Sequence, residues 1–482
     1  MPANLPHLRV GLGVAAAIVL VVAALWLDVL PLGSYVIGLV GLLGLAALVI
    51  AVRWQVGAPV EGLSVLLVAA LIAPLPIQGG IDACLVLALA SSGVWLVRTG
   101  LAGQAPLDET RAVAATLFFM LVAAVSFVVG QYPWFPTAGA PMAAQLGGLA
   151  LFLVSGSLFL AVGHLVRTEA DLEKLTMIFV AVGGLTVTIG LLPWSVVPFI
   201  DRVNAVIRPD TLGSCFWTWL VAVSSAQAFF NRSLAPHRRL ALLAVAVVTL
   251  GRGLLVAFSW VSGWLPPMVA FGLVCFLRFP RLSVALGLLS IAPGVVVAKP
   301  AIDALMQGES YSWMTRLEAM GVIWQLVRTN PLLGFGPANY YHYTLLFPIL
   351  GWWVRFNSHN NYIDLVAQTG FLGLLAFFWF CTEVFLIAWR LRRRATSFFG
   401  RAYAVGALAG LAGSLVSGLL ADWIVPFAYN IGLTGFRSSL LFWFLLGGLL
   451  TLRRLSAAPQ PTASGLARRQ DLGALALAGM RP

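Results

Sequence analysis

Residues 316–373 read RLEAMGVIWQLVRTNPLLGFGPANYYHYTLLFPILGWWVRFNSHNNYIDLVAQTGFLG. This stretch holds four polar functional candidates, namely Arg316, Arg328, Arg355 and His359, in a chain that is otherwise mostly apolar. Polar residues that gather in one segment of such a chain point to a site. We therefore interpret the stretch as an extracytoplasmic loop that runs into a membrane helix, and we read the rest of the chain around it.

The stretch divides into three parts by local pattern. Apolar residues recur at three- and four-residue spacing at its start, which predicts a short amphipathic helix: Leu317, Met320, Trp324 and Val327. Asn330-Pro331 ends this helix, and Gly334 and Gly336 permit a tight backbone turn. Aromatic residues suited to a membrane surface and to stacking on sugar rings follow: Tyr340, Tyr341, Tyr343, Trp352 and Trp353.

The composition of the whole chain is that of an integral membrane protein. Of its 482 residues, 60% are hydrophobic and 10% are charged, and the mean hydropathy is +0.95. Apolar runs recur from end to end, each long enough to cross about 30 Å of hydrocarbon as a helix. We predict an all-α, polytopic membrane helix bundle with about 12–14 transmembrane helices.

The predicted spans give the chain an orientation. They lie at 8–27, 33–52, 62–77, 80–97, 110–130, 145–166, 173–192, 211–230, 239–258, 264–277, 281–298, 359–389, 400–420 and 435–453. Most Arg and Lys residues then fall on one side, including the run from Arg390 to Arg394, and this side is predicted to be cytoplasmic. The loop 299–358, with its short helices and the site, then faces outward.

The remaining features limit the alternatives. We predict one membrane domain, 1–455, and a disordered cytoplasmic tail, 456–482, which has too little apolar surface to fold. The four cysteines lie in apolar runs and behave as small hydrophobic residues. The net charge of +12 reflects arginines in short loops, so we expect membrane lipids and not nucleic acid as the partner. No metal-ligand or nucleotide motif is present, and we expect neither metal nor cofactor.

His359 is the candidate base. It lies in Asn-Ser-His-Asn-Asn where the loop meets a helix, and Asn357 or Ser358 is placed to cap that helix. The positive end of the helix and nearby arginines should lower the pKa of His359 and keep the imidazole neutral. It could then accept a proton from a sugar hydroxyl. The alternative is an interfacial histidine that bonds to loop backbone.

Arginines are the candidate anion ligands. Arg252 lies in an apolar stretch between two glycines, where a charge needs an anion, a cavity or access to the interface. Arg316 and Arg355 add positive charge to the outward loop, and guanidinium groups suit the oxygens of a diphosphate. Loop solvation or pairing is the alternative, and it is favoured for Arg328 and Arg355 taken singly. For Asp422 and Arg437, at the last outer loop, a structural salt bridge is expected.

The chain resembles the O-antigen ligase and O-antigen polymerase superfamily of bacterial membrane glycosyltransferases. Three stretches carry this resemblance, which spans roughly residues 239–390: TLGRGLLVAF at 249–258, RLEAMGVIWQLVRTNPLLGFGPANY at 316–340, and HNNYIDLVAQTGFLGLLAF at 359–377. They are similar to the family's T-x-S-R-G segment, its R-x-x-x-W…P-x-x-G-x-G pattern and its H-N-x-x-L…G-x-x-G-L helix. Gly251, Met320 and Gln368 stand where the family usually has serine, tryptophan and glutamate.

The resemblance implies a metal-independent reaction at the outer face of the bacterial cytoplasmic membrane. A glycan would pass from an undecaprenyl-diphosphate-linked donor to the hydroxyl of a lipid or glycan acceptor. Arg252 and Arg316 match the arginines that engage the donor diphosphate, and His359 matches the histidine that acts on the acceptor. We add four candidates for supporting roles: Arg355, Asn360, Tyr340 and Arg437.

Two alternatives stay open at this point. A polymerase, which extends one lipid-linked chain with another, shares these motifs with a ligase. A transporter of an anionic lipid or glycolipid would also need arginines in a cavity, but it predicts polar residues through the full depth of the membrane. The crowding of polar residues at the outer rim favours the enzyme.

Overall fold

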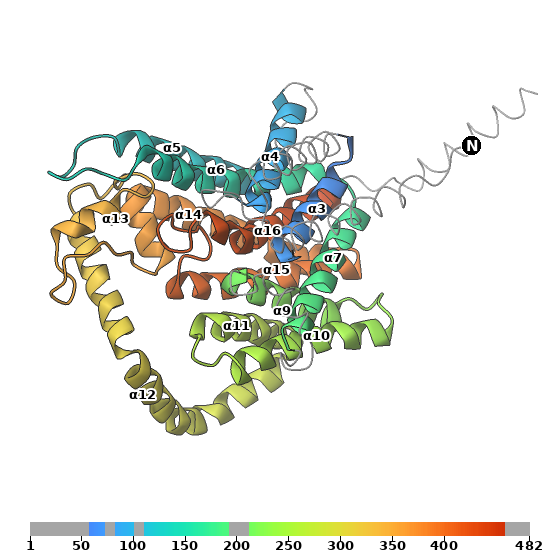
Figure 1. Ribbon diagram of the computed structural model, residues 1–482. Helices are drawn as coiled ribbons and strands as arrows, with labels where there is room; N and C mark the ends of the chain where they lie inside the picture. Colours follow the sequence, from blue (N-terminus) through green and yellow to red (C-terminus); the bar gives the residue numbers. More distant parts are fainter. Residues whose placement is uncertain (1–56, 73–81, 101–109, 192–211, 458–482) are drawn as a thin grey trace, which may run out of the picture.

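The computed structural model describes residues 57–72, 82–100, 110–191 and 212–457 (Figure 1). The predicted spans 8–27 and 33–52, and the tail beyond residue 457, lie outside the described residues. Within the described ranges every regular element is a helix, and the one β-type pairing is an isolated bridge between Ile349 and Trp352. The predicted all-α class is confirmed.

The described helices fall into two groups along the chain. The first group is α3 (Pro59–Ile72), α4 (Ala83–Gly100), α5 (Arg111–Val129), α6 (Met142–Leu165), α7 (Glu169–Ile189), α9 (Gly213–Phe230), α10 (Pro236–Leu255) and α11 (Val261–Arg278). The second group is α12 (Pro280–Val327), α13 (Tyr340–Tyr343), η2 (Thr344–Leu346), α14 (Asn361–Arg394), α15 (Phe398–Leu420), η3 (Leu433–Gly435) and α16 (Phe436–Ala457).

Seven helices of the described residues are long and apolar enough to cross a membrane: α5, α6, α7, α11, α14, α15 and α16 with η3. Each coincides with a predicted span to within a few residues. The chain is therefore a multi-pass membrane protein, as predicted. The other predicted spans fall on α3, α4, α9, α10 and α12, or outside the described residues.

Helix α16 is the centre of the bundle and packs against α6, α9, α14 and α15 (Figure 1). Its Trp443 is fully buried and stacks on Phe380 of α14, with 5.0 Å between ring centroids. Gly447 lets α16 approach α6 closely, because a Cβ there would lie 2.7 Å from the carbonyl oxygen of Phe159. Close approach at small residues is how helices associate in lipid.

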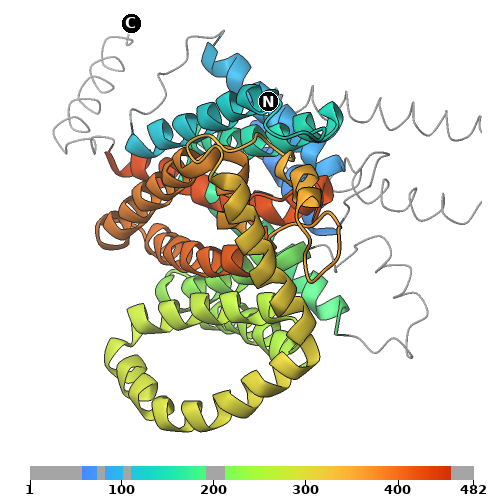
Figure 2. The same ribbon diagram turned by 90° about the vertical axis from the view of Figure 1, so that its left-hand side faces the viewer.

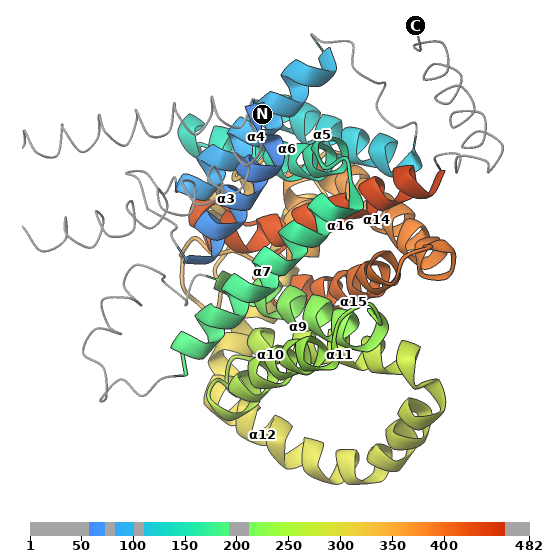
Figure 3. The same cartoon turned by 90° about the vertical axis from the view of Figure 1, so that its right-hand side faces the viewer.

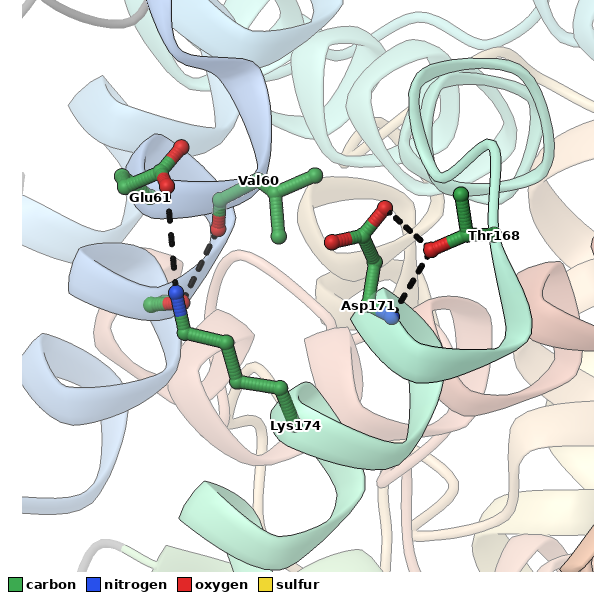
Figure 4. Close-up of polar contacts among 6 residues, drawn as sticks. Val60, Glu61, Thr168, Asp171 and Lys174 are labelled. Atoms are coloured by element: carbon green, nitrogen blue, oxygen red, sulfur yellow. Dashed lines mark hydrogen bonds and ion pairs between the residues drawn. The ribbon is translucent and has the colours of Figure 1, made fainter. Parts of the chain in front are cut away.

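Charged contacts between helices are sparse in the described part of the chain. Lys174 of α7 lies 3.8 Å from Glu61 of α3, and both side chains are partly exposed (Figure 4). Thr168 caps α7 by accepting a hydrogen bond from the Asp171 N–H, and its hydroxyl donates to the Asp171 carboxylate (Figure 4). Such exposed pairs contribute little to stability, so apolar packing holds the bundle together.

The connections between helices lie at two ends of the bundle, because successive helices run in alternating directions. These two ends differ in composition. One end carries the connections 130–141, 256–260, 328–360 and 421–432, and we call it the loop end (on the left in Figure 1). The opposite end carries the turns 166–168, 231–235 and 395–397 and most of the described arginines, and we call it the arginine end.

Helix α12 departs from the predicted structure. We predicted a span at 281–298 and, after a loop, a short amphipathic helix, but α12 is one helix of 48 residues. At 1.5 Å per residue it is about 72 Å long, more than twice the hydrocarbon thickness. It bows away from the bundle and returns to the loop end (Figures 2 and 3). Pro293 and Pro300 fall within it, and proline bends a helix by removing a backbone hydrogen bond.

Candidate functional site

A backbone joint between the loop after α12 and helix α14 builds the floor of the site. Gly370 interrupts α14 with φ 68° and ψ −175°, which frees backbone groups on both sides of it. Four hydrogen bonds then cross between the two segments: Phe335 N–H to Ala367 O (3.0 Å), Gly336 N–H to Gln368 O (2.9 Å), Phe371 N–H to Pro331 O (2.8 Å) and Leu372 N–H to Leu332 O (3.2 Å). The broken helix and the loop thus satisfy each other's free backbone hydrogen-bonding groups.

Glycines are required in this joint for two reasons. Gly334, Gly336 and Gly370 all have positive φ, which disfavours any residue with a Cβ. A Cβ at Gly334 would also lie 2.6 Å from the carbonyl oxygen of Ala367, and one at Gly370 would overlap the carbonyl of Leu332. The spacing of the glycines in the sequence therefore reflects backbone contact between two distant segments.

Two buried amide side chains fix the joint to its surroundings. The side chain of Asn339 accepts from the Ala140 N–H (2.9 Å) and donates to Phe335 O (2.8 Å), so it ties the 130–141 connection to the loop. The Oε1 atom of Gln368 accepts from the N–H of Ala338 at 3.1 Å. Gln368 stands where the family usually has glutamate, and here its amide holds the loop.

His359 lies at the loop end, one residue before the cap of α14. Its φ is 49°, in the left-handed region, and its side chain is half-buried. Burial and the nearby positive charge of Arg316 together lower the pKa of His359 to about 4. The imidazole is therefore neutral at physiological pH, as predicted, although burial and not the helix dipole is the first cause.

The two asparagines after His359 have separate structural tasks. Asn360, and not Asn357 or Ser358 as we predicted, caps α14, because its Oδ1 accepts from the N–H groups of Tyr362 (3.0 Å) and Ile363 (3.3 Å). The side chain of Asn361 bonds instead to the 421–432 connection. Its Oδ1 accepts from the Ile424 N–H (2.7 Å) and its Nδ2 donates to Val425 O (2.8 Å). The histidine segment is thereby held between α14 and the 421–432 connection.

A buried acidic centre lies directly behind this segment. The Oδ1 atom of Asp364 accepts from the hydroxyl groups of Tyr340 and Ser358, the latter at 2.7 Å. The Oδ2 atom of Asp364 is buried and has no hydrogen-bond partner among the described residues. Burial and the carboxylate of Asp364 raise the pKa of Tyr340, so this phenol is a donor and stays protonated.

Asp422 is the second acid of this centre, and its negative charge acts on Asp364. Its carboxylate accepts from the Phe427 N–H (2.6 Å) and from the side chain of Asn430. Burial raises the pKa of Asp422 to about 6 even though these hydrogen bonds oppose the shift. Sequence reasoning did not single out Asp364. The signal that could have found it is an acid in the first turn of a long apolar helix.

An aromatic cluster covers the acidic centre on the loop side. Tyr341 and Tyr429 stack with 4.5 Å between ring centroids and 9° between ring planes, and the Tyr429 hydroxyl lies 3.1 Å from Nε2 of His342. Arg355 is exposed, and its charge acts on His342 and Tyr429. The supporting candidates Tyr340, Asn360 and Arg355 thus all lie around the histidine segment.

Arg252 reaches the same end of the bundle from other helices. It is in the last turn of α10, and its guanidinium carbon lies 4.5 Å from the centre of the Trp217 ring of α9. Its Nε lies near Gly190 at the end of α7. The structure therefore brings Arg316 and His359 together, and it places Arg252 at the loop end against α7 and α9.

Asp422 and Arg437 engage different groups, which departs from the salt bridge that we expected. Arg437 is fully buried in α16, where it donates to the carbonyl oxygens of Ala70 (2.8 Å) and Leu71 (3.2 Å) at the end of α3. Its charge also acts on the buried carboxyl group of Asp82. Arg437 therefore joins α3 to α16.

Chemically, the loop end offers a neutral imidazole, guanidinium groups and aromatic rings around a buried acidic centre. Among the described residues no group of three or more His, Cys, Asp or Glu side chains is placed to hold a metal ion. Fold and site together define a multi-pass, all-helical membrane protein in which Arg316 and His359 lie near one another at the loop end of the bundle.

Residues 237–378 match the family model described as O-antigen ligase. This match confirms the resemblance to the O-antigen ligase superfamily, and it covers α10, Arg252, Arg316, His359 and the glycine joint. It supports an O-antigen ligase-like membrane glycosyltransferase at the family level, with a lipid-linked glycan as the class of substrate. No curated protein shows significant sequence similarity to the chain.

Proposed function

We propose that this protein moves a glycan from an undecaprenyl-diphosphate-linked donor to an acceptor hydroxyl, without a metal, on the outer face of the bacterial cytoplasmic membrane. Arg316 and Arg252 bind the donor diphosphate, and His359 is the catalytic base. The observation that carries this proposal is the half-buried, neutral His359 under the charge of Arg316 at the loop end.

The reaction balances with these groups alone. The acceptor oxygen attacks the anomeric carbon and forms the new glycosidic bond, while the bond from that carbon to the diphosphate oxygen breaks. The bonding electrons leave with undecaprenyl diphosphate, and the proton of the acceptor hydroxyl passes to His359. Attack in one step inverts the anomeric carbon. Fixed guanidinium groups stabilise the charge that develops on the diphosphate.

Donor binding should also raise the pKa of His359. A pKa of about 4 keeps His359 neutral but makes it a weak base. A diphosphate beside Arg316 cancels the positive charge that helps to lower the pKa. The pKa of His359 then rises, and the imidazole gains basicity only when the donor is in place. This coupling would limit proton transfer in the absence of substrate.

The distribution of charge supports the outward orientation. The arginine end carries most of the described basic residues, and cytoplasmic loops are the ones rich in Arg and Lys. The loop end then faces outward, where lipid-linked glycans are joined. Supporting roles are assigned to Tyr340 and Asn360, which position the histidine segment, and to Arg355 at the aromatic cluster.

The test is glycan transfer by the purified full chain, reconstituted with a defined lipid-linked oligosaccharide and an acceptor. We expect His359→Ala and Arg316→Ala each to lower the rate at least about 100-fold, as loss of a base or of an oxyanion ligand does. Arg328→Ala is the matched control, because Arg328 is exposed at the end of the same helix. Near-normal transfer by His359→Ala would remove the histidine from the mechanism.

The product distinguishes the alternatives. Transfer to a lipid acceptor of another kind indicates a ligase, whereas elongation of one lipid-linked chain by another indicates a polymerase with the same donor chemistry. Movement of intact donor across the bilayer, unaffected by His359→Ala, would indicate a transporter of an anionic lipid or glycolipid and contradict the proposal.

A further inference from the structure

Several helix ends converge at the arginine end. The last turn of α14 holds Arg392, Arg393 and Arg394, and a turn of three residues leads to α15, where Arg401 lies in the first turn. The last turn of α16 is adjacent, because a Cβ at Gly400 would lie 3.6 Å from the side chain of Leu452. Arg453 follows Leu452 directly, so the ends of three helices bring arginines to this part of the arginine end.

Three guanidinium nitrogens in this cluster lack a protein partner. The Nε atoms of Arg392 and Arg401 and the Nη1 atom of Arg453 are buried and make no hydrogen bond to the described residues. A buried donor without a partner is unfavourable, and more so when it is charged. Arg454 differs, because it donates to the carbonyl oxygens of Gly163 (3.1 Å) and Val166 (2.6 Å).

The arginines at this end outnumber the described carboxylates. Glu169 and Glu173 of α7 lie there, and three further carboxylates are engaged with other groups. Glu61 pairs with Lys174, and Asp171 accepts from the hydroxyl of Thr168 (Figure 4). Glu383 accepts from Trp379 within α14 at 3.3 Å. The guanidinium cluster therefore keeps a net positive charge, and an anion from outside the chain is its natural counterpart.

An apolar strip runs from the cluster along α14. The guanidinium carbons of Arg392 and Arg393 lie 3.9 Å and 5.7 Å from the Trp389 ring centre. Phe385 stacks on Trp389 one turn further into the membrane span and is 42% exposed, and Phe398 at the start of α15 is 44% exposed. A ligand that satisfies both features has an anionic head and apolar tails.

We propose that the cluster of Arg392, Arg401 and Arg453 binds the phosphate group of an anionic phospholipid, whose acyl chains lie along Phe385, Trp389 and Phe398. Positive clusters next to membrane helices attract anionic lipids, and the fork of an arginine suits phosphate oxygens. The strip of aromatic rings favours a lipid over free phosphate. This site lies at the opposite end from the proposed reaction and does not depend on it.

The test measures lipid bound to the full chain in a neutral detergent, which has no charged bilayer surface. Phosphatidylglycerol is titrated and the bound molecules are counted by native mass spectrometry, with phosphatidylcholine as the uncharged comparison. We expect the triple variant Arg392→Gln, Arg401→Gln, Arg453→Gln to bind phosphatidylglycerol at least about tenfold more weakly, since each arginine contributes a severalfold factor.

The matched control removes the same number of charges from exposed positions of the arginine end that lie outside the cluster: Arg232→Gln, Arg238→Gln, Arg390→Gln. It should change the affinity by no more than about twofold. Equal weakening in both variants would show general charge attraction and overturn the site. Equal binding of inorganic phosphate, with no preference for phosphatidylglycerol, would indicate a free-anion site and would also overturn the proposal.

Thermal stability without added lipid separates binding from folding. One buried nitrogen of each arginine makes no hydrogen bond to the described residues, while Arg401 also donates to Ala395 O at 3.5 Å and Arg392 lies over the Trp389 ring. We therefore expect the triple variant without lipid to unfold within about 4 °C of the native chain. It should lose the stabilisation that phosphatidylglycerol gives the native chain. A lower unfolding temperature that is the same with and without lipid would mean that the arginines serve the fold, and the lipid site would be wrong.

Discussion

At the scale of single residues, three features determine the position and the protonation state of His359. The backbone of His359 has a positive φ, and α14 begins directly after it with the cap residue Asn360. Arg316 of α12 contributes a nearby positive charge. Burial and this charge both disfavour the imidazolium form. The imidazole is therefore held in its neutral form by groups from two distant segments.

This gives a titration prediction for His359. The chain has five histidines, and the signal that His359→Gln removes from a spectrum of histidine-labelled protein identifies the residue. We expect it to titrate near pH 4 in the free protein and at a higher pH with a bound donor diphosphate. Titration near 6.5 without donor, or a pKa that does not respond to donor, would contradict the proposed coupling.

The same shift predicts how stability depends on pH. The folded-state pKa of about 4 lies below the ordinary value of 6.5, so the unfolded chain binds the proton more tightly. Stability from this residue is therefore fully present above pH 6.5 and falls as the pH decreases from 6.5 towards 4. His359→Gln should flatten this part of a plot of unfolding temperature against pH.

At the scale of elements, the glycine joint fixes α14 relative to the loop that follows α12. The loop that follows α12 supplies N–H groups to the carbonyls freed by the break at Gly370, and the break supplies N–H groups to the loop. Arg316 and His359 lie on the two elements that this joint connects. The relative placement of Arg316 and His359 therefore depends on these backbone contacts as well as on the side chains themselves.

Gly370→Ala tests the joint. The new Cβ would need a positive φ and would overlap the carbonyl of Leu332, so we expect a loss of roughly 2–5 kcal/mol in the free energy of unfolding. Glycan transfer should fall with it. The control is Gly272→Ala, an exposed helical position with open space around its Cβ, which should be neutral or slightly stabilising. Thermal unfolding of both variants in detergent is the measurement.

At the scale of the whole molecule, the two ends predict a topology. Trp353 is 63% exposed at the loop end, and Thr396 is exposed in the turn at the arginine end. In intact cells, a membrane-impermeant maleimide should label Trp353→Cys and should label Thr396→Cys only after permeabilisation. The native cysteines Cys84, Cys215 and Cys381 are buried, and Cys275 is partly buried, so the background should be low. The reverse pattern would place the loop end in the cytoplasm.

Much of the architecture could be predicted from the sequence because long apolar runs have one stable state in a membrane, the helix. The boundaries of α5, α6 and α15 follow from composition alone to within a few residues. The predicted break after residue 298 was wrong in detail, because the chain stays helical through a polar stretch and bends instead. The division into a domain 1–455 and a tail stays a prediction.

The sequence by itself determined the membrane class and the arginine-rich end, and it predicted Arg252, Arg316 and His359 as the candidate site, since each of these depends on local composition or motif. Only the tertiary structure decided that Asp364 and Tyr340 support the histidine segment, that Arg437 joins α3 to α16, and that Gln368 holds the loop. The physical reason is that burial and hydrogen-bond partners come from segments far apart in the chain, and local pattern does not specify which of them meet.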